Sequence, residues 1–281
     1  MSANEPKTWL ITGASAGFGR IIAAQVLTRG DHAVLTARDP SKLDDLVQRY
    51  PDQARALALD VTKPADAARV IAGIESLDVL VNNAGHGLVG AVEEVEPAEY
   101  RPMFETNLFG LIELTRAALP LLRRTAAMGR PVRIVNFSSV GGMTGRPGFG
   151  LYNASKFAVE GLSEALAHEL APFGIAVVIV EPGAFRTEFL GRSLTTAARV
   201  IPAYDATSGA TRRFSVEGGG KQPGDPERGI AVLLQAVDAA NPPLRLALGR
   251  DAYTRICEKL DRVASDLGTW EVTAADTDHR A

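Results

Sequence analysis

The sequence of 281 residues predicts an α/β fold, with a doubly wound parallel β-sheet flanked by helices in a single domain. Three observations lead to this prediction. Short apolar runs alternate with segments of about 10 to 15 residues that are apolar on one face, as in right-handed strand–helix–strand units. A glycine-rich turn joins the first run to the first helical segment, and later runs end in small or polar residues. The chain is long enough to bury one large core.

The predicted elements extend along almost the whole chain. We expect strands at residues 8–12, 32–37, 54–60, 77–81, 132–138, 175–181 and 245–249. We expect helices at residues 20–29, 64–74, 97–126, 227–240 and 251–267, a helix through Tyr152 to about residue 171, and a short one from Ser41. Residues 184–226 lose this regularity and are predicted to form a lid over a pocket. Residues 268–281 are predicted to be a loose polar tail.

The composition excludes several classes of function. The net charge of −3 is spread along the chain, so no basic face for nucleic acid is expected. The four histidines are scattered without metal-ligand spacing, and no metal site is predicted. A single cysteine, Cys257, indicates a reducing compartment. No apolar run approaches the roughly 18 residues of a membrane span, so we expect a cytoplasmic protein without a membrane partner.

The first strand leads directly into Gly13, Gly17 and Gly19, with the spacing T-G-x-x-x-G-x-G. Such a strand–turn–helix unit presents backbone N–H groups and a helix N-terminus to a pyrophosphate. The alternative is a glycine-rich turn without a ligand. The position of the turn between a strand and a helix favours the binding site.

The second strand ends at Ala37, where a carboxylate would hold an adenosine ribose diol. Arg38 follows instead, and a guanidinium can bind a 2′-phosphate through two hydrogen bonds. We therefore expect NADP(H) in preference to NAD(H), unless Asp39 neutralises Arg38 or Arg38 is an ordinary surface residue. At the end of the third strand, Asp60 could accept a hydrogen bond from an adenine amine.

Tyr152 and Lys156 are four residues apart and therefore share one face of a helix. A lysine cation near a phenol is expected to lower the pKa of the tyrosine from about 10 toward neutrality. Tyr152 then becomes a candidate general acid for a carbonyl oxygen, or a base in the reverse reaction. Ser139, thirteen residues earlier, could donate a second hydrogen bond to the same oxygen.

Two asparagines interrupt apolar patterns. Asn83, at the end of the fourth strand, is followed by Ala84 and Gly85, and its amide could join neighbouring strands. Asn107 lies on the inward face of a long helix. A buried amide needs hydrogen-bond partners, so Asn107 is either a satisfied core residue or part of a site.

The motifs Thr12-Gly13-x-x-x-Gly17-x-Gly19, Asn82-Asn83-Ala84-Gly85, Asn107, Ser139, Tyr152-x-x-x-Lys156 and Pro182-Gly183-x-x-x-Thr187 occur in this order. Together they resemble the classical short-chain dehydrogenase/reductase family over residues from about 8 to 250. The resemblance implies a Rossmann-type sheet, with a cofactor half at about residues 5–130 and a catalytic and substrate half at about 131–250. It also implies transfer of a hydride between nicotinamide and a carbonyl or alcohol carbon.

The resemblance assigns a role to each matching residue. The catalytic residues are Asn107, which anchors a water, Ser139, which binds the substrate oxygen in preference to Ser138, Tyr152, the proton donor, and Lys156. Ala16 occupies the place of a basic residue found in many NADP-using members. The cofactor residues are expected to be Gly13, Ser15, Gly17, Phe18, Gly19, Arg38, Asp60, Val61, Asn83, Ala84, Gly85, Tyr152, Lys156, Pro182, Gly183 and Thr187.

The resulting hypothesis is an NADPH-dependent carbonyl reductase for a hydrophobic substrate. Its pocket is predicted to be lined by His86, Met143, Phe149, Leu151, Phe185 and Phe189. The alternative is a cofactor-binding sensor or scaffold without turnover, although such proteins typically lose the tyrosine or the lysine. The resemblance also implies a homodimer or homotetramer formed through the helices that carry Asn107 and Tyr152.

Overall fold

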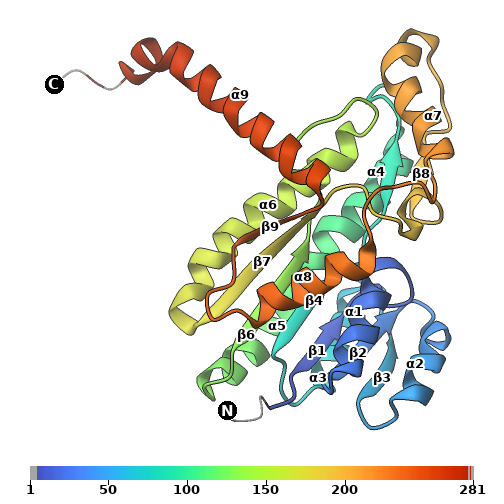
Figure 1. The fold of residues 1–281 in the computed structure, drawn as a ribbon, viewed down its shortest axis with the longest axis vertical. Helices are drawn as coiled ribbons and strands as arrows, with labels where there is room; N and C mark the ends of the chain where they lie inside the picture. Colours follow the sequence, from blue (N-terminus) through green and yellow to red (C-terminus); the bar gives the residue numbers. More distant parts are fainter. Residues whose placement is uncertain (1–4, 278, 280–281) are drawn as a thin grey trace.

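A computed structural model describes residues 5–277 and 279 of the chain. Its centre is a seven-stranded parallel sheet, which confirms the predicted α/β class (Figure 1). The strand order is β3-β2-β1-β4-β6-β7-β9. The strands are β1 (Thr8–Ile11), β2 (His32–Ala37), β3 (Ala54–Ala58), β4 (Val79–Asn82), β6 (Val132–Phe137), β7 (Ile175–Pro182) and β9 (Arg245–Leu248).

Helices cover both faces of the sheet. One face packs against α1 (Gly17–Thr28), α2 (Asp44–Arg49) and α8 (Pro226–Asp238), which contribute Ile22, Leu46 and Leu233 to its core. The other face packs against α3 (Pro64–Ala72), α5 (Gly110–Ala127) and α6 (Gly150–Leu170), which contribute Val70, Leu114 and Leu166. Because the strand order reverses between β1 and β4, the connections diverge there and leave a crevice at the carboxyl ends of the strands.

The predicted helix at residues 97–126 is observed as three consecutive helical segments. α4 (Pro97–Phe104) leads into a π-helical turn at Glu105–Phe109, which continues directly into α5. The helix keeps its course past the internal Pro102 and Pro120. A π turn adds one residue to the ordinary helical turn, and such turns are frequent at functional sites. Asn107 lies in this π turn.

The segment 184–226 contains more regular structure than the sequence indicated. It includes α7 (Ala210–Glu217) and the short strand β8 (Leu194–Thr196). β8 pairs in parallel with β5 (Gly87–Val89), which was also missed. The buried carboxylate of Glu94 accepts hydrogen bonds from the backbone N–H groups of Ala91 and Ile201, each at 2.8 Å. The segment is therefore attached to the residues that follow β4.

The last helix, α9 (Arg250–Ala275), is longer than predicted and projects from the body of the molecule (Figure 1). It passes the expected end at residue 267, so the first part of the expected loose tail, residues 268–275, is helical. Residues 278, 280 and 281 of that tail lie outside the described part of the chain. None of the helices that the structure describes is long and apolar enough to span a bilayer.

Candidate active site

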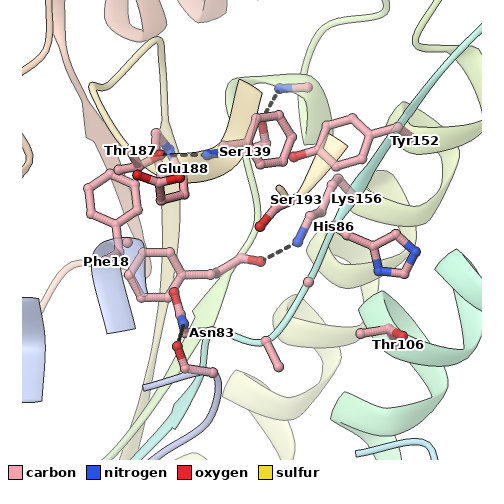
Figure 2. Close-up of a pocket in the computed structure, with 18 of the residues that line it drawn as sticks. Phe18, Asn83, His86, Thr106, Ser139, Tyr152, Lys156, Thr187, Glu188 and Ser193 are labelled. Carbon is pink, nitrogen blue, oxygen red and sulfur yellow. Dashed lines mark hydrogen bonds between the residues drawn. The ribbon is translucent and has the colours of Figure 1, made fainter. Parts of the chain in front are cut away.

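A cavity of about 1430 Å³ lies at the carboxyl ends of the strands. Its wall combines the glycine turn after β1, the residues that follow β2, β4, β6 and β7, and the N-terminal turns of α6. The segment that follows β7 adds most residues from 187 to 195, and also Phe214, Ser215, Gln222 and Pro223. Tyr152 and Lys156 extend from α6 into the same space that Phe18 and Asn83 border (Figure 2).

The glycine turn forms one end of the cavity. Gly13 and Gly17 have φ angles of +64° and +53°, a conformation that favours glycine. At Gly19 a Cβ atom would lie 2.5 Å from both Asn83 Nδ2 and Gly13 O, so only glycine allows this close packing. Gly19 therefore packs against Gly13 and Asn83 on the side of the turn away from the cavity, and it does not line the cavity.

The first turn of α1 has no side-chain cap, because its N-cap residue is Ala16. Its N–H groups and the positive end of the helix dipole remain available to an anion. Gly13, Ser15, Gly17 and Phe18 all line the cavity here. These features fit the pyrophosphate of a dinucleotide.

Thr12 and Asn83 join the first and fourth strands beside the turn. The Thr12 hydroxyl accepts hydrogen bonds from the backbone N–H groups of Asn83 and Ala84, at 2.9 and 3.0 Å. The Asn83 amide donates to the carbonyl of Thr12 at 2.9 Å, the strand-joining contact that the sequence indicated. This hydrogen bond holds the Asn83 side chain in a fixed position at the cavity wall.

Arg38 is exposed at the cavity edge, beyond the end of β2. No hydrogen bond or ion pair engages its guanidinium among the residues that the structure describes. Asp39 accepts instead from the backbone N–H and hydroxyl of Ser41, at 3.2 and 2.7 Å, so it does not pair with Arg38. Asp60 and Val61 line the wall nearby.

Tyr152 and Ser139 form the opposite end of the cavity. The Tyr152 side chain is buried, with the rings of Phe149 and Phe189 at centroid distances of 5.8 and 5.7 Å. Burial raises the pKa of Tyr152 to about 12, and the hydrogen bond with the Ser139 side chain opposes this shift. The expected lowering toward neutrality is therefore wrong, because desolvation of a phenolate outweighs the opposing hydrogen bond.

Lys156 is also buried, and its ammonium donates a hydrogen bond to the carbonyl of Phe137 at 2.8 Å. Burial lowers the pKa of Lys156 to about 8, while the charge of Glu160 acts in the opposite direction. His86 faces the same cavity, and burial, followed by the charges of Arg38 and Lys156, lowers its pKa. Burial thus shifts the pKa values of Tyr152, Lys156 and His86 toward their neutral forms.

Comparisons with known proteins agree with this geometry. Residues 7–197 match the short chain dehydrogenase family. The chain belongs to the short-chain dehydrogenase/reductase family. It is therefore an NAD(P)-dependent oxidoreductase that acts on CH–OH groups, as the sequence predicted.

Three similar proteins span most of the chain. A short-chain dehydrogenase from Streptomyces avermitilis has 46% identity and a TM-score of 0.90, with 98% of this chain and 100% of that chain covered. The 3-ketodihydrosphingosine reductase of Bacteroides thetaiotaomicron is 38% identical over 87% of this chain and 88% of its own. Human retinol dehydrogenase 8 is 34% identical over 86% and 81%, respectively.

Asn107 lies beside Lys156 but is not on the cavity wall. Its amide donates to the carbonyl of His86 at 2.9 Å and to the Ser155 hydroxyl at 3.2 Å. Its side-chain oxygen accepts from the backbone N–H of His86 at 2.9 Å. The π turn brings this amide into the core, where it fixes the chain next to Gly85 and Lys156.

Two of the six residues predicted for the substrate pocket, Met143 and Leu151, do not line the cavity. Met143 packs against Val140, Ala252 and Ile256, and Leu151 packs in the cluster formed around Leu88 and Met103. Phe185 lines the glycine end, with its ring 5.2 Å from that of Phe18. Sequence proximity to Tyr152 or to Pro182-Gly183 did not reveal which side each residue faces. His86, Phe149 and Phe189 lie on the wall near Tyr152.

The sequence analysis missed a buried acidic pair behind Ser138 and Lys156. Glu160 and Glu181 are 5% and 1% exposed, and Arg245 Nε lies 3.5 and 3.3 Å from their carboxylate oxygens. Burial and, after it, the charge of Glu160 raise the pKa of Glu181 to about 7, while Arg245 acts in the opposite direction. One signal was available: Glu160 is one helical turn beyond Lys156, on the same buried face.

Proposed function

We propose that this enzyme reduces a carbonyl group on a largely apolar substrate and uses NADPH in preference to NADH. The contact between Tyr152 and Ser139 carries the proposal, since it places two hydroxyl groups at one point of a cavity that continues to the glycine turn. A substrate oxygen bound there would accept a hydrogen bond from each. When bound, the nicotinamide supplies the hydride.

Side chains of the protein would orient the substrate oxygen, donate the proton and stabilise the phenolate that results. The Ser139 hydroxyl orients the substrate oxygen, and Tyr152 donates its proton to that oxygen as negative charge develops. A pKa of about 12 keeps the Tyr152 hydroxyl protonated at neutral pH, as an acid must be. The nearby Lys156 ammonium, in its charged form, would stabilise the phenolate that remains.

The cofactor preference follows from Arg38. A guanidinium without a protein partner at the end of β2 is suited to a 2′-phosphate, and no carboxylate pairs with it in the described part of the chain. Gly13, Ser15, Gly17 and Phe18 would hold the pyrophosphate end, and Asp60 with Val61 the adenine. Tyr152, Lys156, Pro182, Gly183 and Thr187 would surround the nicotinamide half.

The apolar substrate class follows from the aromatic rings at the catalytic end. Phe149 and Phe189 pack on Tyr152, and Phe214 of α7 lies on the same cavity wall. The residues from 184 to 226 would act as the lid. Two similar proteins are named for lipid-like alcohols or ketones, a ketodihydrosphingosine and retinol, which is compatible with such a wall.

The proposal includes a cytoplasmic homo-oligomer. The long helices α5 and α6 follow or contain the exposed rings of Phe109 and Phe157, which are 47% and 45% exposed. Exposed aromatic residues of this kind are typical of subunit interfaces. The interface of a homodimer would therefore lie along these helices.

One experiment tests the proton donor. Tyr152→Phe should lower kcat for ketone reduction by a factor of about 100 or more, because a general acid is lost. Binding of NADPH, measured by its fluorescence, should stay nearly unchanged. A panel of ketones, aldehydes and alcohols with each cofactor would define the substrate class. A Tyr152→Phe enzyme with a rate near that of the wild type would refute the assignment.

A further inference from the structure

The helix α9 carries an apolar face that the rest of the described chain does not cover. Its first turns pack on the body, where Ala252 and Ile256 are 0% and 8% exposed. Beyond them, the same face continues with Leu260, Val263, Leu267 and Trp270, which are 53%, 37%, 69% and 65% exposed. We refer to residues 258–275 as the arm, which extends away from the body in Figure 1.

The spacing of the apolar residues is that of a two-stranded coiled coil. From Tyr253 the apolar positions follow at alternate intervals of three and four residues: Ile256, Leu260, Val263, Leu267, Trp270 and Ala274. In heptad terms, Tyr253, Leu260, Leu267 and Ala274 occupy position a, and Ile256, Val263 and Trp270 occupy position d. A helix with such a seam is stabilised by packing against another helix.

The arm needs that packing to be a stable helix. It contains Gly268 and the β-branched Val272 and Thr273, which have low helix propensity. An isolated helix of this length is marginal in water, and most helical stability in proteins comes from packing of an apolar face. The contacts of α9 with the body involve its first two turns, for example Asp251 with Ala184 and Arg255 with Thr144.

We propose that the arm pairs with the arm of a second copy of this chain in an antiparallel coiled coil. The charges beside the seam determine this orientation. Positions g carry Lys259 and Asp266, and positions e carry Cys257, Ala264 and Glu271. In an antiparallel pair, Lys259 meets Asp266 of the second copy twice, by symmetry. In a parallel pair, Asp266 would meet Glu271, a like-charge contact.

The antiparallel arrangement also determines which apolar residues of the two copies face each other. Leu260 would pack against Val263 of the second copy, and by symmetry Val263 against Leu260, at the centre of the pair. Trp270 would cover Tyr253, which is 64% exposed at the base of the helix. Each arm would therefore end against the body of the other copy.

The charge of the arm disfavours an anionic membrane surface as the occupant of this face. Within residues 258–275 the basic side chains are Lys259 and Arg262, and the acidic ones are Glu258, Asp261, Asp266 and Glu271, a net charge of −2. Helices that lie on anionic lipid carry an excess of lysine and arginine on the polar face. The face is better suited to a helix with its own pattern of charges.

The association is tested on the full-length protein by sedimentation. Leu267→Glu should halve the mass of the particle, while Ser265→Glu, on the opposite face of the arm, should leave it unchanged. Lys259→Asp should weaken self-association about tenfold, because two attractive contacts become repulsive. The double variant Lys259→Asp with Asp266→Lys should restore it. Equal masses for Leu267→Glu and Ser265→Glu would overturn the proposal.

A cross-linking experiment tests the orientation. Positions 257 and 264 face each other in the antiparallel register, so Ala264→Cys should be linked to the native Cys257 of a second copy by a short bismaleimide. The variant that also carries Cys257→Ser should give no covalent dimer. Absence of the dimer from Ala264→Cys, or pelleting of the wild type with phosphatidylcholine–phosphatidylglycerol vesicles that Leu267→Glu abolishes, would count against the coiled coil.

Discussion

The two ends of the cavity differ in what forms them: backbone geometry at the glycine end, and buried ionisable side chains at the tyrosine end. At the glycine end, backbone geometry and an uncapped helix N-terminus prepare the wall, and no buried ionisable side chain takes part in the contacts described there. At the tyrosine end, Tyr152 and Lys156 are buried, and desolvation moves the pKa values of both toward their neutral forms. Substitutions at the first end should therefore alter binding, and those at the second should alter rate and pH dependence.

After that of Tyr152→Phe, the largest expected effect is that of Lys156→Met. Loss of the ammonium should lower kcat/KM by a factor of about 100, since the phenolate formed after proton transfer loses its stabilising charge. In the wild type, kcat/KM for reduction should be level below pH 8 and fall above it, as the lysine, with a pKa of about 8, loses its proton. A pH–rate profile with no inflection near pH 8 would contradict this.

The same variant should be more stable than the wild type at pH 7. The folded-state pKa of Lys156 is lowered from 10.5 to about 8, so burial of the charged form costs stability below pH 8. This cost in folding free energy declines as the pH rises from 8 to 10.5, because over that range Lys156 is neutral in the folded protein but still binds a proton in the unfolded chain. Thermal melting of Lys156→Met and wild type should show a difference that shrinks across this range.

Arg38→Ala probes the glycine end. The substitution should weaken NADPH binding about tenfold, because charge-assisted hydrogen bonds to the 2′-phosphate are lost. Binding of NADH and the shape of the pH–rate profile should not change. Lys42→Ala, at an exposed cation away from the cavity, serves as the control. Equal losses for the two cofactors would remove the basis for an NADPH preference.

Glu181→Gln tests the buried acidic pair behind the tyrosine end. The pKa of Glu181 is raised from 4.5 to about 7, so ionisation of this group reduces the stability of the fold as the pH rises through that range. The glutamine variant should gain about 1 kcal/mol above pH 7, since a like charge beside Glu160 is removed. Its advantage over the wild type should be absent below about pH 4.5. Urea unfolding at pH 4.5 and 8 measures both values.

The smallest effect is expected at the contact that holds α7. Arg212 donates to Glu94 at 2.6 Å, and this pair joins α7 to the residues that follow β5. Arg212→Met should raise KM for the carbonyl substrate about threefold by loosening the lid, and it should leave NADPH affinity unchanged. The control is Arg213→Met, which removes an exposed ion pair with Asp205. Identical KM values for the two variants would mean that α7 does not gate the substrate.

The success of sequence interpretation differed along the chain for physical reasons. The seven strands of the main sheet and the helices on its two faces were predicted, because buried parallel strands and amphipathic helices have clear periodic patterns. β5, β8 and α7 were missed, since elements of three and eight residues show too few repeats. The C-terminal end of α9 was also missed, because many polar residues lie between the apolar positions of this segment.

Where a motif fixes the backbone, the residues predicted for the site lie at one cavity. The glycine turn, Ser139, Tyr152 and Lys156 come together at one cavity, as their spacing on strands and helices indicated. The pKa of Tyr152 was predicted in the wrong direction, because desolvation depends on burial that a spacing of four residues does not reveal. Met143 and Leu151 were misplaced for a similar reason: neighbours in sequence on a turn or helix face different directions.

Asp251 connects the last helix to the cavity wall. This residue of α9 accepts a hydrogen bond from the backbone N–H of Ala184 at 2.8 Å, just after the Pro182-Gly183 turn. The family match ends at residue 197, so this support comes from outside the region that defines the family. A gene shortened to that region would encode the glycine turn and Tyr152 without the contact that holds the backbone after Pro182-Gly183.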